Sequence, residues 1–163
     1  MYQIEVKALL VKAKFHAKEG WNVCVHVDPM EKAKGGSHPN GKREAAQHSL
    51  DVLEKAGASI RAHPMYGRID IVAEKPGEPC YFIEVEADSS RQREQGMYSA
   101  LGQLLVAMND SNRRYALAVP DTPEWNAQVT KIPQRVLDLL KLEIFLVSEH
   151  GVRMKGSQLS KTV

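Results

Sequence analysis

Hydrophobic residues recur along the chain with two different periods. A spacing of three and four residues predicts helices over 2–18, 43–56, 90–108 and 123–140. Alternation of apolar and polar residues predicts strands over 21–27, 67–74, 80–87, 114–119 and 142–147, and a shorter one at 58–62. Pro133 predicts a kink or a break in the last helix. This order predicts an α/β fold with a mixed central sheet flanked by helices on both faces.

Two segments lack such a pattern. Residues 30–41 (MEKAKGGSHPNG) are rich in Gly and Lys and contain a Pro, which is typical of a loop. The tail from Gly151 is polar, and we expect it to be frayed. We therefore predict one domain over 1–163. Its parts are a core at about 1–120, an inserted loop and helix at 30–57, a helix–strand extension at 121–150 and the tail at 151–163.

The composition narrows the class of protein. With 163 residues, 43% hydrophobic and 26% charged, the chain is typical of a single soluble globular domain. No apolar run approaches the ~20 residues of a membrane span, and the first twenty residues lack the apolar core of a signal peptide. Cys24 and Cys80 are too few for a disulfide framework. We expect a cytoplasmic protein without an organic cofactor, and the net charge of +2 permits DNA as a partner without arguing for it.

Three acidic residues lie on the hairpin predicted for 67–87. Glu84 and Glu86 are two residues apart and so point to one face of their strand, and an antiparallel neighbour would bring Asp70 beside them. Carboxylates so placed repel one another, and a hard cation such as Mg²⁺ removes that repulsion. An alternation of apolar and acidic residues is also typical of any half-exposed strand. Asp70 favours a metal site, because Asp is disfavoured within strands.

Three segments in this order carry a resemblance. GRIDIV at 67–72, IEVEA at 83–87 and ALGQLL at 100–105 together resemble the PD-(D/E)XK nuclease superfamily, which has the restriction-endonuclease-like fold. Asp70 matches the first acid of its motif, Glu84 matches the second, and Gln103 matches a glutamine on the following helix. The resemblance covers about residues 1–120.

The resemblance implies a Mg²⁺-dependent DNA endonuclease in which Mn²⁺ can replace Mg²⁺. Asp70 and Glu84 would hold the metal with the carbonyl of Val85, and Gln103 would position the metal site or the substrate. Glu5 on the leading helix is a candidate auxiliary ligand, although a solvated helix residue is the commoner role for such a side chain. One active site per chain would favour a homodimer for cutting both strands.

Position 86 departs from the family pattern. The family usually has Lys there, which helps to orient or activate the attacking water, and this chain has Glu86. A carboxylate can act as a general base or bind a second metal ion, so Glu86 joins the candidate catalytic residues. Other members of the fold have lost the Lys together with the activity. The alternative is therefore an inactive nuclease-fold module that binds nucleic acid or a protein partner. A third and less favoured hypothesis is an enzyme that acts on a small molecule and uses the carboxylates as acid and base.

Basic residues flank these acids along the sequence and are the candidates for contacting DNA. They are Arg68, Arg91, Arg93, Lys32, Lys34, Lys42 and Arg43. At helical spacing, Lys7, Lys14 and Lys18 would add a short stripe. Taken singly, each group is more typical of a solvated surface, so the prediction depends on their gathering around the acids.

Overall fold

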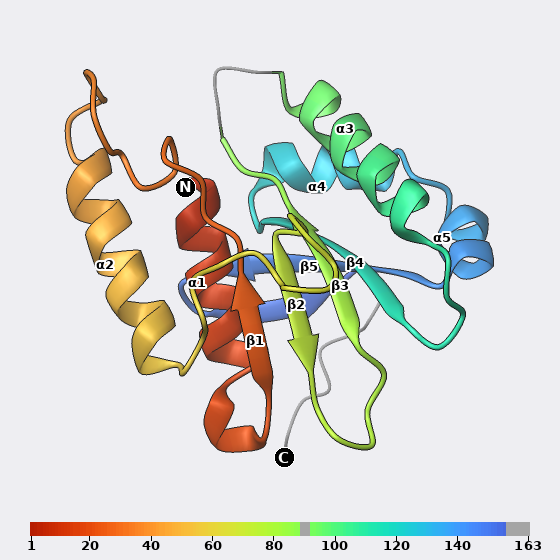
Figure 1. The fold of residues 1–163 in the computed structure, drawn as a ribbon. Helices are drawn as coiled ribbons and strands as arrows, with labels where there is room; N and C mark the ends of the chain where they lie inside the picture. The colour runs from red at the N-terminus through yellow and green to blue at the C-terminus, as the bar shows by residue number, and fades with distance from the viewer. Residues whose placement is uncertain (89–91, 156–163) are drawn as a thin grey trace, which may run out of the picture.

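The computed structural model describes residues 1–88 and 92–155, which form one six-stranded sheet with helices on both faces (Figure 1). The helices are α1 (Gln3–Lys14), α2 (Lys42–Lys55), α3 (Arg93–Ala107), α4 (Pro123–Thr130) and α5 (Gln134–Leu140). The strands are β1 (Asn22–Val25), β2 (Ile71–Glu74), β3 (Tyr81–Val85), β4 (Arg114–Pro120), β5 (Leu142–Ser148) and β6 (Gly151–Met154).

The strands lie in the sheet in their sequence order, β1-β2-β3-β4-β5-β6. The pairs β3–β4 and β4–β5 are parallel, and the other three pairs are antiparallel. Each parallel connection contains helices, as a crossover between parallel strands requires. The predicted fold class, a mixed central sheet flanked by helices, is confirmed and is consistent with a restriction-endonuclease-like α/β fold.

The sheet separates two hydrophobic cores. Helix α1 packs against strands β3 to β6 on one face, and α2 packs against α1 (Figure 1). On the other face α3 contacts β3 and β4, and α5 contacts β5. Because successive strand residues point to opposite faces, Ile83 and Val85 belong to the α1 core, whereas Phe82 belongs to the α3 core. Glu84 has the same parity as Phe82 and therefore lies on the α3 face of the sheet.

Several predicted elements differ from those in the structure. The tail is not frayed from its start, because Gly151–Met154 form β6, which pairs with β5, and Val152 and Met154 pack against the α1 core. The predicted strand at 58–62 is reduced to one bridge between Ser59 and Cys24. The break predicted at Pro133 is confirmed, since it separates α4 from α5. Within the described ranges, no helix is long and apolar enough to cross a membrane.

Candidate active site

Asp70 and Glu84 lie together where β2 and β3 separate. The last residues paired at this end of the hairpin are Ile71 and Ile83, so the register places Asp70 opposite Glu84 just beyond the ladder. The side chain of Asp70 acts here as a backbone carbonyl of a neighbouring strand would, because its Oδ2 accepts a hydrogen bond of 2.9 Å from the backbone N–H of Val85. The structure thus brings the two acids of the predicted motif to one place.

Glu84 is a buried carboxyl group, with 7% of its surface exposed. Its burial, the negative charge of Asp70 and a side-chain hydrogen bond with Asp70 together raise the pKa of Glu84 to about 9. Lys7 acts in the opposite direction, but its effect is smaller. Glu84 therefore keeps its proton at neutral pH.

Lys7 reaches this pair from α1, on the other face of the sheet. Its side chain is fully buried, and its Nζ lies 2.7 Å from Oδ1 of Asp70 and 2.7 Å from the carbonyl oxygen of His26. The two carboxylate oxygens of Glu31 lie 2.8 and 2.9 Å from the same nitrogen. Burial by itself lowers the pKa of Lys7, but the charges of Asp70 and Glu31 outweigh it, so the pKa is raised and the ammonium stays protonated.

The burial of Lys7 corrects the prediction that it shares a surface stripe with Lys14 and Lys18. Both sides of α1 are covered, one by α2 and the other by the sheet, so a lysine between its apolar faces is enclosed. Its ammonium is accommodated there because three protein groups accept its hydrogen bonds. The helical spacing of the lysines gave no sign of this, since it does not show which faces of α1 are covered.

Glu86 lies beside the pair, between α1 and α3. Nε2 of Gln3 donates hydrogen bonds to the carbonyl oxygen of Val85 at 2.8 Å and to Oε2 of Glu86 at 3.5 Å. On the other side Gly96 of α3 leaves the space for this carboxylate, because a Cβ at position 96 would lie 2.9 Å from Oε2 of Glu86. Glu86 is therefore held at the end of β3 by residues of two helices.

The glutamine at this site is Gln3 and not the predicted Gln103. Gln103 is exposed on α3, about two helical turns beyond Gly96, and the structure does not bring it to Asp70 and Glu84. Glu5 caps its own helix, since its Oε2 accepts a hydrogen bond of 2.6 Å from the backbone N–H of Tyr2. The only sequence signal for Gln3 is its place in the first turn of the leading helix.

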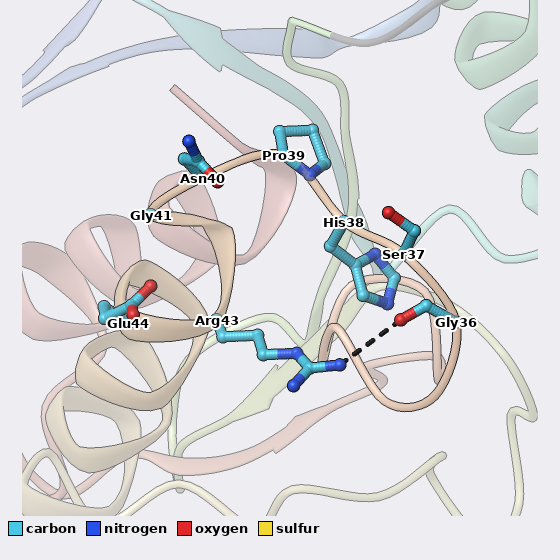
Figure 2. A pocket seen from close by; sticks show the side chains of 8 residues that line it. All are labelled: Gly36, Ser37, His38, Pro39, Asn40, Gly41, Arg43 and Glu44. Carbon is cyan, nitrogen blue, oxygen red and sulfur yellow. Dashed lines mark hydrogen bonds between the residues drawn. The ribbon is translucent and has the colours of Figure 1, made fainter.

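Three of the candidate DNA-binding residues contact other residues of the protein. Arg93 forms an ion pair of 2.9 Å with Asp88. Arg43 donates a hydrogen bond of 3.3 Å to the carbonyl oxygen of Gly36 (Figure 2). Nζ of Lys42 lies 5.7 Å from the ring centroid of Tyr2. The remaining candidates are the exposed Arg68 and Lys34, the half-buried Lys32, and Arg91, which lies outside the described residues.

Two hollows adjoin these residues. A groove of about 710 Å³ runs between the start of α1, the loop before α2 and the end of β3, and four carboxylates line it, those of Asp28, Glu31, Glu86 and Asp88. A second hollow of about 560 Å³ lies within the loop and the start of α2, lined by residues 36–41, 43 and 44 (Figure 2). The groove is thus largely acidic, with Lys42 and His38 on its wall.

The residues present fit a divalent cation held by two carboxylates. In the part of the chain that the structure describes, no group of three or more His, Cys, Asp or Glu side chains is placed to hold a metal ion. Mg²⁺, however, is commonly bound through one or two carboxylates, with waters and a substrate phosphate completing its shell. Asp70 and Glu84 supply two, and a cation between them would favour the ionised form of Glu84 that burial disfavours.

Comparison with known proteins adds one structural likeness. No family model matches the chain, and no curated protein matches it. A structural neighbour among solved proteins is the crystal structure of an XisH family protein from Nostoc punctiforme. The TM-score is 0.47 at 16% sequence identity, and the match covers 92% of this chain and 96% of that one. A likeness of this degree does not extend to function.

Proposed function

We propose that this chain is a metal-dependent endonuclease that hydrolyses phosphodiester bonds of DNA. The observation that carries the proposal is the pair of Asp70 and the buried Glu84 at the end of the β2–β3 hairpin, with the ammonium of Lys7 at 2.7 Å from Asp70. Asp70 and Glu84 match the two acids of the PD-(D/E)XK pattern. The pattern has a lysine at position 86, where this chain has Glu, but Lys7 of α1 places an ammonium group next to Asp70.

Each residue has a separate part in this proposal. Asp70 and Glu84 would hold a Mg²⁺ or Mn²⁺ ion, which would supply a bound water of lowered pKa and positive charge next to the phosphate. Lys7 and the N–H of Val85 fix the orientation of Asp70. Gln3 orients the carbonyl of Val85, which keeps a second lone pair for a ligand. Glu86 lines the groove and is placed to accept a proton there.

The test is a cleavage assay on supercoiled, linear, branched and single-stranded DNA in Mg²⁺, Mn²⁺ or EDTA. We expect metal-dependent cutting by the wild type and its loss in Asp70→Asn and in Glu84→Gln. Glu54→Gln is the matched control, because Glu54 is an exposed carboxylate on α2 and should leave the activity unchanged. Cutting that survives Asp70→Asn would refute the assignment. Paired cuts in linear DNA would point to a homodimer, which analytical ultracentrifugation would test.

A second candidate function is an inactive module that binds a partner. The observation in its favour is the acidic groove, in which Glu86 stands at the position where the pattern has a lysine. Such a groove repels phosphate unless a cation is bound. Titration calorimetry with Mn²⁺ separates the two candidates, since heat of binding that Asp70→Asn removes is expected of the nuclease and not of the module.

A further inference from the structure

Lys7 uses its three hydrogen-bond donors on three different partners. An ammonium group has three N–H bonds, and here they are directed at Asp70, at the main chain of His26 and at Glu31. Asp70 and His26 belong to the ends of neighbouring strands, where the main chains are linked because the N–H of His26 donates to the carbonyl of Asp70 at 2.9 Å. These two partners are therefore fixed parts of the sheet.

Glu31 differs from the other two partners in where it lies. It belongs to the loop between β1 and α2, and of the three partners it alone lines the groove. Its hydrogen bonds with Asp28, from the N–H of Asp28 at 3.0 Å and from its own N–H to Asp28 at 2.8 Å, are local to the loop. Lys7 is fully buried and does not line the groove, so the carboxylate of Glu31 is the contact that connects its ammonium to the groove wall.

Lys7, Asp70, Glu84 and Glu31 form a cluster of charged groups, and the balance of its charges would allow another anion to replace the carboxylate of Glu31. With a divalent cation on Asp70 and Glu84, that cation and Lys7 together balance three carboxylates, so the cluster is neutral with Glu31 in place. A phosphodiester oxygen is also an anionic acceptor, and it suits an ammonium donor as a carboxylate does. If a phosphodiester replaced Glu31 at Lys7, the cluster would keep its neutrality.

We propose that Lys7 is a binding group for a backbone phosphate of the nucleic acid, and that Glu31 holds the place of that phosphate until substrate enters the groove. The proposal rests on the proposed function for the choice of ligand, a phosphodiester, and it adds a site to it. In the free protein Glu31 keeps the ammonium of Lys7 paired, and in the complex the loop carries Glu31 away from it.

The experiment measures binding of a short fluorescein-labelled DNA duplex by anisotropy, with Ca²⁺ in place of Mg²⁺ and the integrity of the duplex checked after each titration. The proteins are the wild type, Glu31→Gln, Glu44→Gln and the double variant Lys7→Met/Glu31→Gln. Glu44 is an exposed carboxylate beside the same loop, so Glu44→Gln measures the general effect of removing one negative charge there. Circular dichroism and the unfolding midpoint establish that each variant is folded.

We expect Glu31→Gln to bind the duplex about tenfold more tightly than Glu44→Gln, which corresponds to about 1.4 kcal/mol, near the value of one charge-assisted hydrogen bond. The double variant should lose this gain, because the ammonium that receives the phosphate is gone. Equal affinities of Glu31→Gln and Glu44→Gln would overturn the proposal. So would a double variant that binds as tightly as Glu31→Gln.

The two proposals fail in different ways. If the wild type cleaves DNA and Glu31→Gln shows no gain in affinity, only the role of Glu31 and Lys7 is refuted. If no substrate is cleaved but Glu31→Gln gains affinity in a manner that needs Lys7, the phosphate site stands and the nuclease is refuted. If no protein of the set binds DNA, both are refuted.

Discussion

The protonated carboxyl of Glu84 should make the stability of the protein depend on pH, and Glu84→Gln should remove that dependence. The pKa of Glu84 is raised from 4.5 to about 9 in the folded state. The folded state therefore keeps a proton that the unfolded chain releases above pH 4.5. The stability that the proton provides is complete below that pH and is lost as the pH rises toward 9.

The size of the effect follows from the linkage relation. Each pH unit between the two pKa values costs about 1.4 kcal/mol of unfolding free energy. Between pH 5 and pH 7 the wild type should lose about 2–3 kcal/mol through this group. Glu84→Gln keeps the shape and a hydrogen-bond donor toward Asp70 but has no proton to release. The variant should therefore be more stable than the wild type at pH 7, and the difference should shrink at pH 5.

The assay is urea unfolding of both proteins across this pH range, with and without Mg²⁺. A stability difference between wild type and Glu84→Gln that is the same at pH 5 and pH 7 would refute the reasoning. Mg²⁺ at neutral pH should stabilise the wild type more than the variant, because a cation that binds only the folded state adds to its stability. Equal stabilisation of both proteins would mean that Glu84 is not a ligand.

Three further changes test other contacts. Lys7→Met should lower the unfolding free energy by about 3–5 kcal/mol, as measured in urea, because it leaves the partly buried carboxylates of Glu31 and Asp70 without their cation. Gly96→Ala should change stability by less than about 1 kcal/mol, since helix propensity offsets the crowding, but it should displace Glu86 and alter the rate of any cleavage. Arg153→Lys should cost about 1–2 kcal/mol in thermal unfolding, because lysine cannot reproduce the two hydrogen bonds of Arg153 to Asp121 at 2.6 and 2.8 Å.

The hairpin and its acids could be predicted because their geometry is local. The alternation of residues and the short turn set the register, and the register places Asp70 opposite Glu84. The parity of β3 likewise put Glu84 and Glu86 on one face, as the spacing indicated. The two hydrophobic periods also predicted the order of the other elements, because each period reflects the local geometry of its own segment.

The lysine at the site could not be predicted from the sequence, because it comes from a distant element. Lys7 meets Asp70 only through the packing of α1 on the sheet, and no period or spacing relates the two positions. The same applies to Gln3 at the carbonyl of Val85. Gln103 is the opposite case. It matches a glutamine of the motif in residue type and position on α3, but its side chain is exposed to solvent, which the motif did not indicate. Strand β6 was missed because a four-residue strand in a polar tail has almost no periodic signal.

The packing of α1 also bears on the order in which the chain assembles. Each strand pairs with the next one in the sequence, so the sheet can grow in the order of synthesis by contacts of short sequence separation. Helix α1 is the exception, because it lies before all the described strands in the sequence and yet packs on β5 and β6. These contacts join residues far apart in the sequence, so they can close only after β5 and β6 have been synthesised. The ammonium of Lys7 should therefore enter the site late in folding, and a nascent chain that ends before β5 should hold the acidic hairpin without it.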